Sequence, residues 1–232
     1  MKKFIKKIFP GLAVFRSSIL EVQRKYNISI LRPLIIFDVG ANNGDNFVDI
    51  TRFPWVKVHA FEPTPDLVKI IKSRIKNRRN YFVNEYAISD KEEVVNFNIA
   101  GQGDWGCSSL LNFNDDINET WKGRDDLKFT KTISVNTIKL STYIQKNNIK
   151  RIDFLHIDVQ GFDLVALKSL ENYIHIVKKG VVEVPVNDAV KLYKGQHSKK
   201  ETIDFLASHG FNIYKVTTQH NEENLFFKRE NN

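Results

Sequence analysis

Sulfur and long apolar runs are scarce in this sequence, and each scarcity excludes a class of protein. Cys107 is the single cysteine among 232 residues, which excludes an internal disulfide framework and fits a reducing compartment. Ser108 follows it, but no accompanying Cys-His-Asn pattern supports a cysteine nucleophile. No apolar run is long enough to span a bilayer. These features predict a cytoplasmic protein.

The length and composition suit one α/β domain of ordinary core size, since 42% of the residues are apolar. We expect this domain over residues 31–230, after a basic, helical extension over residues 1–30. The extension begins with four lysines among apolar residues, and Pro10-Gly11 and Arg16 break its resemblance to a signal peptide. We interpret it as an amphipathic tip that contacts the inner face of a membrane or a partner chain. A packed N-terminal helix is an equally good interpretation.

The formal net charge is +8, which fits nucleic acid, an acidic surface or anionic substrates as partners. No nucleic-acid-binding motif is present, so we expect a small-molecule or glycan acceptor and no nucleic acid. The basic cluster over residues 72–79 is interpreted as a solvated helix face. The sequence leaves the oligomeric state open, and a homo-oligomer is one alternative.

The most informative stretch begins with Leu34-Ile35-Ile36-Phe37, which is typical of a strand buried on both faces. Asp38 follows, then Gly40 and Gly44, which permit a tight turn and close approach of a ligand. A helix is expected over Asn46–Phe53. A turn of this kind, after the first strand of an open α/β sheet, usually binds a nucleotide-like ligand.

The spacing of the turn decides which ligand fits. A dinucleotide fingerprint reads G-x-G-x-x-G, whereas Asn42 stands here between two glycines spaced G-x-x-x-G. Asp38 would repel a pyrophosphate but attract a cation such as S-adenosyl-L-methionine, which carries an ammonium and a sulfonium. The alternatives are an NAD-dependent oxidoreductase, or a plain turn in which Asp38 caps a helix.

Glu62 ends the second expected strand, about two dozen residues after the turn, where an acid usually binds a ribose diol. Two hydroxyl donors on one carboxylate make charge-assisted hydrogen bonds. The alternative is that Glu62 caps the helix that begins at Thr64-Pro65.

At these residues the chain resembles the FkbM-type methyltransferases, which use S-adenosylmethionine. The stretches that carry the resemblance are Phe37–Gly44, Ala60–Pro63, Tyr86–Asp90, Cys107–Leu110, Ile157–Asp163, Glu183–Val184 and Leu192–Gln196. Each is weak alone, and their order and spacing make the set specific. One departure is Gln160, where many members carry Glu.

The resemblance implies a Rossmann-like class I methyltransferase fold, with a mostly parallel seven-stranded sheet and a C-terminal antiparallel hairpin. It implies cofactor contacts at Asp38, Gly40, Asn42, Gly44, Glu62 and Asp158, with the Ala87 region at adenine and Ser109 facing cofactor or acceptor. It also implies O-methylation, and by analogy a sugar hydroxyl of a bacterial surface glycan, glycolipid or related metabolite. A non-catalytic binding module on the same fold is a further alternative. The segment over residues 101–126 is expected at the mouth of the site.

Candidate bases follow from the strand ends. Strands ending at Asp38, Asp158 and Glu183 should bring these carboxylates to one rim, with Asp38 and Asp158 at the cofactor crevice. Asp158 is the first choice as the base that takes the acceptor's proton, before Glu183 and His156. A packed strand residue is the alternative for His156. No full set of metal ligands is present, so no metal is predicted.

Overall fold

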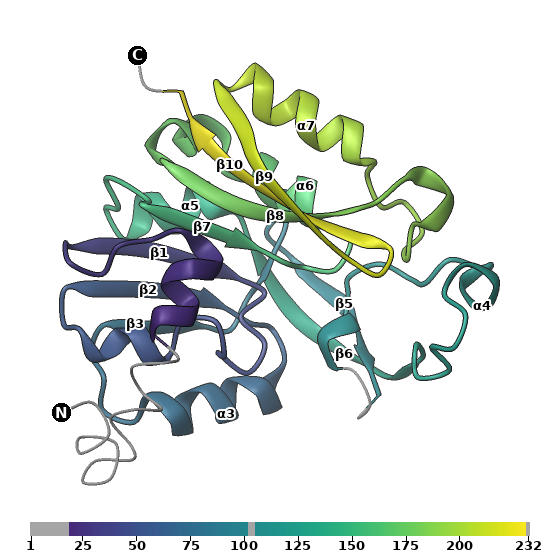
Figure 1. Cartoon of the computed structure of the whole chain (residues 1–232). Coiled ribbons are helices and arrows are strands. Elements are labelled where there is room, and N and C mark those ends of the chain that lie inside the picture. The colour runs from purple at the N-terminus through teal and green to yellow at the C-terminus, as the bar shows by residue number, and fades with distance from the viewer. Residues whose placement is uncertain (1–18, 102–104, 231–232) are drawn as a thin grey trace, which may run out of the picture.

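The computed structural model describes residues 19–101 and 105–230, and its centre is a seven-stranded sheet in the order β3-β2-β1-β7-β8-β10-β9 (Figure 1). The strands are β1 (Leu34–Val39), β2 (Val56–Phe61), β3 (Tyr81–Asn84), β7 (Phe154–Ile157), β8 (Lys179–Pro185), β9 (Phe211–Gln219) and β10 (Glu222–Arg229). β10 runs antiparallel to β8 and β9, and the other neighbours are parallel. The expected class I sheet with its C-terminal antiparallel hairpin is confirmed.

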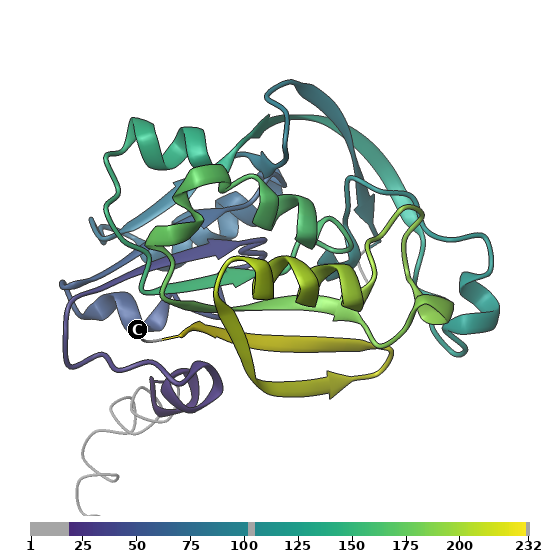
Figure 2. The ribbon, with the colours of Figure 1, turned by 90° about the horizontal axis from the view of Figure 1, so that it is seen from above.

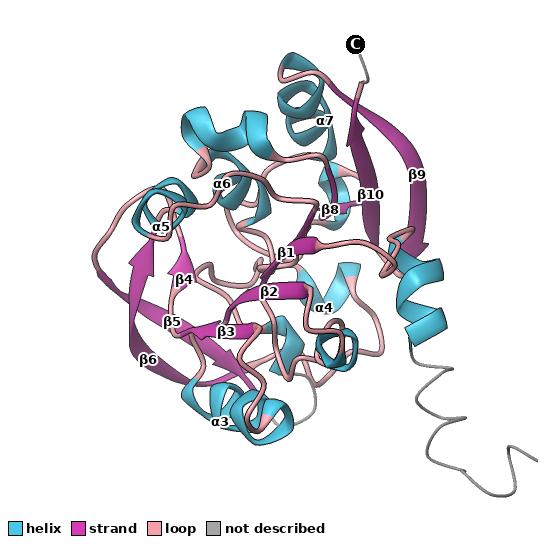
Figure 3. Cartoon of the chain, turned by 90° about the vertical axis from the view of Figure 1, so that its left-hand side faces the viewer, coloured by secondary structure: helices cyan, strands magenta, loops and turns pink. Residues whose placement is uncertain are grey.

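Both faces of the sheet are covered, because the central strands are apolar on both sides. On one face Phe37 and Leu155 pack with residues of α5, α6 and α7, which lie together in Figures 2 and 3. On the other face Ile36 and Phe154 pack with α3 and with the helical residues 19–26. The helices are α3 (Pro65–Ile75), α5 (Leu140–Lys146), α6 (Asp163–Lys168) and α7 (Lys199–Ser208).

A second, three-stranded sheet extends beyond the ends of the parallel strands (Figure 1). Its order is β4-β6-β5, with β4 (Ala87–Ile88) parallel and β5 (Val94–Ala100) antiparallel to β6 (Phe129–Ile138). Between β5 and β6 lie the short helices η2 (Trp105–Cys107) and α4 (Ile117–Thr120). This sheet and its connection form a wall beside the carboxyl ends of the main sheet.

The helix expected over Asn46–Phe53 is wrong. The chain there makes successive turns and only a short 3-10 helix, η1 (Asp49–Arg52). A surface helix exposes part of every turn, whereas Phe47, Val48, Ile50 and Thr51 are all at least 98% buried. Successive tight turns, unlike a surface helix, allow all four side chains to be buried. Two further 3-10 helices are η3 (Glu171–Ile176) and η4 (Asp188–Val190).

The N-terminal segment is described only from residue 19. Tyr26, Ile28 and Ile30 belong to the same core cluster as β1 and β2, and the expected boundary at residue 30 stays a prediction. Residues 1–18, with the four lysines of the expected amphipathic tip, lie outside the described part. Within the described ranges, no helix is long and apolar enough to cross a membrane.

Candidate active site

A cleft of about 400 Å³ opens at the carboxyl ends of β1, β2, β7 and β8, the edge where the strand order reverses. Open α/β sheets bind ligands at this point because the connections diverge there. Of the predicted site residues, the cleft wall includes Gly40, Asn42, Glu62, Ala87, Asp158 and Glu183. The volume suits a small molecule.

The turn after β1 is shaped by Gly40, which has φ +83°. A Cβ atom there would lie 1.7 Å from the backbone oxygen of Asp158, so only glycine allows this approach of the turns after β1 and β7. Asn42 also has a left-handed backbone, with φ +51°, which asparagine tolerates better than most residues. Gly44 has φ +81°, and a Cβ atom would lie 2.7 Å from Cγ2 of Val48. The turn therefore presents backbone to the cleft.

Glu62 lies just after β2 and joins two of these loops. One carboxylate oxygen accepts the amide N–H of Asn42 at 2.9 Å, and the other accepts that of Thr64 at 2.8 Å. Thr64 caps α3, so Glu62 both supports this helix and lines the cleft. Burial raises its pKa to about 7, although the two amide hydrogen bonds oppose the rise. A ligand that donates hydroxyl groups to this carboxylate would favour its ionised form.

Two carboxyl groups, from Asp158 after β7 and Glu183 in β8, lie on either side of Gln160. The Gln160 amide donates to Asp158 Oδ1 at 2.6 Å and to Glu183 Oε2 at 3.1 Å. Burial, and then the negative charge of Asp158, raise the pKa of Glu183 well above its ordinary value. Two close carboxylates resist ionising together, which favours the protonated form of Glu183.

Contacts with Tyr193 and Ser109 fix the orientation of Gln160. The side-chain oxygen of Gln160, Oε1, lies 2.8 Å from the Tyr193 hydroxyl. This hydroxyl also lies 2.9 Å from the backbone oxygen of Cys107 and can donate to either oxygen. The backbone oxygen of Gln160 accepts from Ser109 Oγ at 2.6 Å. Gln160 itself has φ +57°, which is uncommon for a non-glycine residue and is typical of functional sites. The amide nitrogen is therefore held toward the two carboxyl groups.

Four predicted residues are not part of the cleft wall: Asp38, Gly44, Ser109 and His156. Asp38 is fully buried, and one of its oxygens lies 2.9 Å from Nδ1 of His156. The His156 ring packs edge-on against the rings of Tyr26 and Phe47. The expected convergence of Asp38 with Asp158 on the cleft, and the choice of His156 as a base, are therefore wrong. Ser109 is also fully buried and supports Gln160 instead of facing a ligand.

Asn46 is a residue of the cleft wall that the sequence analysis missed. Its side-chain oxygen accepts from the hydroxyl of the buried Tyr26 at 2.6 Å and from Lys25 Nζ at 3.3 Å. A lysine ammonium only donates, so the atom that faces it is the oxygen. The amide nitrogen of Asn46 is thus the group that can donate to a ligand, and its position depends on the helical residues 19–26.

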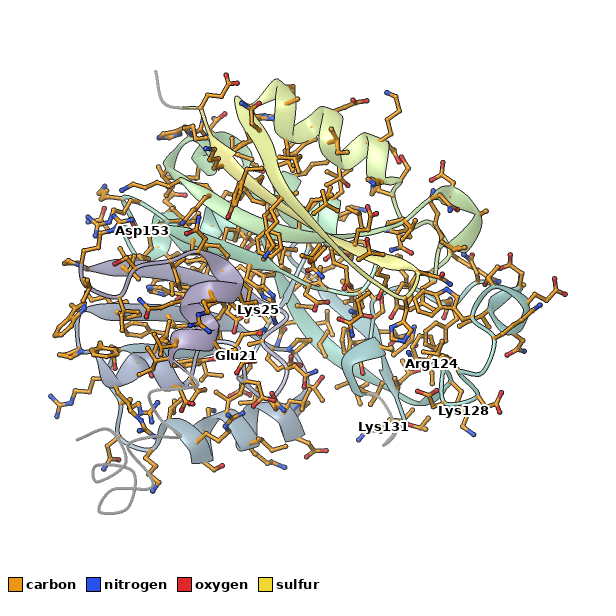
Figure 4. The ribbon with its side chains drawn as sticks, in the orientation of Figure 1. Glu21, Lys25, Arg124, Lys128, Lys131 and Asp153 are labelled. Carbon is orange, nitrogen blue, oxygen red and sulfur yellow. The ribbon has the colours of Figure 1, made fainter. Side chains whose placement is uncertain are left out.

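The outer wall of the cleft comes from segments far away in sequence, and no sequence motif indicated it. The connection expected at the mouth is there, and it contributes Trp121 and Arg124; Arg124 is labelled in Figure 4. Phe97 of β5, Gln219 at the end of β9 and His220 in the β9–β10 turn lie on the same wall. Only the grouping of Gly, Asn and aromatic residues in the connection could have indicated a binding role.

These residues fit S-adenosylmethionine. Glu62 has acceptor sites for a ribose diol, Asn46 has a donor for a carboxylate, and the carboxylate of Asp158 favours a cation. Among the residues that the structure describes, no group of three or more His, Cys, Asp or Glu side chains is arranged to hold a metal ion.

Comparison with known proteins agrees with this geometry. The model of the FkbM methyltransferase domain matches residues 38–213. The 2-O-methyltransferase NoeI of Sinorhizobium fredii is 26% identical over 203 residues, which cover 83% of this chain and 79% of that protein. Fibrillarin of Aeropyrum pernix, solved with bound S-adenosylmethionine, has a TM-score of 0.51 at 10% identity, over 90% of this chain and 73% of that one. The last likeness concerns the fold alone.

The family match covers well over half of the chain and includes the Gly40 turn, Glu62 and the Asp158–Gln160–Glu183 group. It favours a transferase over the alternatives of a nicotinamide-dependent oxidoreductase and a non-catalytic module. The chain belongs to the FkbM methyltransferase family and is an S-adenosylmethionine-dependent methyltransferase.

Proposed function

We propose that this enzyme transfers the methyl group of S-adenosylmethionine to a sugar hydroxyl of a bacterial surface glycan, a glycolipid or a related metabolite. The observation that carries the proposal is the pair of carboxyl groups, Asp158 and Glu183, joined through Gln160 in the cleft. An alcohol must lose its proton when it is methylated, and a positioned carboxylate accelerates such a step by a hundredfold or more. The similarity to a 2-O-methyltransferase supports an oxygen acceptor.

The residues of the cleft divide into two groups in this proposal. Glu62 binds the ribose diol, the backbone near Ala87 borders the adenine, and Asn46 donates to the methionine carboxylate. When bound, S-adenosylmethionine supplies a methyl group already activated by its sulfonium. Asp158 holds the acceptor hydroxyl and takes its proton, while Glu183 keeps its own proton and Gln160 fixes the distance between the two. Most of the rate enhancement then comes from alignment of the acceptor.

The outer wall supports a carbohydrate acceptor. Trp121 borders the cleft but is only 6% exposed, because it packs in a core cluster with Leu192 and Tyr193, so it shapes this wall without presenting a free ring face. Its indole N–H donates to the backbone oxygen of Val190 at 3.1 Å. Gln219 and His220 supply donors and acceptors for hydroxyl groups around it. Apolar walls with a few convergent polar groups are typical of small-molecule sites. A long polypeptide or a duplex would need more open surface than this cleft gives.

The test is to incubate the enzyme with methyl-labelled cofactor and separate pools of nucleotide sugars, free oligosaccharides and lipid-linked glycans. We expect label in an ether on a sugar ring, recovered as an O-methyl sugar after acid hydrolysis. Asp158→Asn is the control, and it should abolish the labelling while binding cofactor. Label in protein, in nucleic acid or on nitrogen, with sugars unlabelled, would reject the proposal.

A further inference from the structure

The side of the sheet where the parallel strands begin, opposite the cleft, carries the positive charge of the molecule. Five segments lead into β1, β2, β3, β7 and β8 on this side, over residues 27–33, 53–57, 76–80, 147–153 and 177–179. Together they contain nine lysines and arginines and one acid, Asp153, an excess of +8. The whole chain also has a net charge of +8, so the remaining residues sum to zero. We call these five segments the basic edge.

The one acid of the basic edge organises the cations around it. Asp153 is fully buried, and its carboxylate contacts Arg151 at 2.9 Å, Lys178 at 3.2 Å and Arg32 at 3.6 Å. These three side chains remain 44–52% exposed, so one buried charge holds three cations at the surface. Asp153 lies at the left of Figure 4, the side onto which Figure 3 looks.

Other cations of the basic edge are uncompensated. Lys76, Arg79 and Lys150 are exposed, and none of them forms an ion pair within the part of the chain that the structure describes. Parallel strands bring their preceding segments to a single side of a sheet. The cations therefore share one face of the molecule, where their fields add.

Apolar side chains project from the same face. Leu31, next to Arg32, is 90% exposed, and Trp55 is 43% exposed. The Trp55 indole N–H donates to the backbone oxygen of Ile30 at 2.7 Å, and the amide of Leu34 donates to the backbone oxygen of Trp55. Leu31 and Trp55 thus lie on adjoining loops. An exposed leucine and tryptophan among cations fit a surface that is both anionic and partly apolar.

We infer that the basic edge docks the enzyme on an anionic lipid bilayer. Phosphate headgroups would pair with the exposed cations, and Leu31 and Trp55 would enter the interface between headgroups and acyl chains. A nucleic acid would use the cations but would leave Leu31 in water, so the apolar pair favours the bilayer. Docking in this way leaves the cleft on the far side of the sheet, about 20 Å away by the length of a six-residue strand. The acceptor then reaches the cleft from the aqueous side.

The experiment compares two triple variants of the full chain by sedimentation with vesicles. Leu31→Ser/Lys76→Gln/Lys150→Gln removes one apolar side chain and two cations from the basic edge. Val94→Ser/Lys91→Gln/Lys200→Gln makes the same chemical changes at exposed positions elsewhere, with Val94 67% exposed. All six residues lie at the surface and outside the cleft, so both variants should fold and bind cofactor, which thermal melting checks.

The wild-type chain should bind vesicles with about one third phosphatidylglycerol, bind phosphatidylcholine alone weakly, and release at high salt. Each cation near an anionic surface contributes about fivefold in affinity, so the basic-edge variant should bind at least tenfold more weakly and the control should match the wild type. Equal binding by the two variants would overturn the inference and assign any affinity to residues outside the basic edge. Failure to bind anionic vesicles, or stronger binding to single-stranded RNA than to vesicles, would also overturn it.

Discussion

Replacing Glu62 with glutamine should weaken cofactor binding by an amount that depends on pH. In the empty cleft, burial raises the pKa of Glu62 to about 7 from an ordinary 4.5. Two ribose hydroxyls donating to the carboxylate would lower this pKa, so binding should release a proton near neutral pH. The bound and free enzymes therefore differ in proton affinity at this one residue.

The structure sets the size of the effect. If binding returns the pKa to its ordinary value, the ionised form is favoured by about 3 kcal/mol in the complex. Cofactor affinity should then rise about tenfold per pH unit between about pH 5 and pH 7 and level off above. Glutamine is uncharged and can accept through only one oxygen, so Glu62→Gln loses a charge-assisted hydrogen bond to the ribose diol, which is about 1.5–3 kcal/mol. The variant should bind ten- to a hundredfold more weakly at high pH and approach the wild type at low pH.

Titration calorimetry with S-adenosylhomocysteine measures both quantities. Runs in two buffers of different ionisation enthalpy give the number of protons released, which should fall toward zero in Glu62→Gln. Glu85→Gln is the matched control, because Glu85 is 53% exposed and pairs with Lys72. Wild-type affinity that is flat across this pH range, or a Glu62→Gln variant that still releases the proton, would refute the assigned role.

Three further changes test other parts of the site. Gly40→Ala should lower stability by several kcal/mol and abolish cofactor binding, whereas Gly123→Ala, at a similar φ of +81° with open space around it, should cost only about 1 kcal/mol by thermal melting. Asp158→Asn should lower kcat at least a hundredfold with cofactor affinity little changed; an unchanged kcat would remove Asp158 as the base. Tyr26→Phe removes the donor to Asn46 and should weaken cofactor binding about fivefold by calorimetry, and equal affinity would separate the helical residues 19–26 from the cofactor site.

Several predicted residues that line the cleft lie in or beside turns whose residues have positive φ values. Gly40, Asn42 and Glu62 follow directly from the order strand, turn, strand and acid, and the structure places all three at the cleft. This success is local, because the turn residues are close in sequence and their positive φ values restrict which residues fit. The same holds for the start of α3 at Thr64 and Pro65.

The errors arose where a strand's pleat decides which way a side chain points. Asp38 lies two residues after Ile36, and His156 two after Phe154, so each faces the same side of the sheet as that apolar residue. The alternation was readable, and it predicts the buried Asp38–His156 contact. Asp158 differs because it lies beyond the last residue of β7, where the pleat no longer directs it.

The sequence predicted that the connection over residues 101–126 lies at the mouth of the cleft, but not which of its side chains line the wall, because these depend on contacts between distant segments. Trp121 meets the cleft through a connection of β5 to β6, and Gln219 through the last hairpin. No motif marks Trp121 or Gln219, and their positions follow from how the second sheet and the hairpin pack on the first. For the same reason the expected helix after Gly44 failed: burial of Phe47 by residues 19–26 overrides a helical pattern.

The strand order also explains where the positive charge of the molecule lies, which the composition does not show. A net charge of +8 gives no indication of where the charge lies, and the basic cluster over residues 72–79 is typical of a solvated helix face. In a parallel sheet every residue that precedes a strand lies at one edge and every residue that follows a strand lies at the other. Lys150 and Lys178 precede β7 and β8, whereas Asp158 and Glu62 follow β7 and β2. One topology therefore gathers carboxylates where a cationic cofactor binds and gathers cations on the opposite edge.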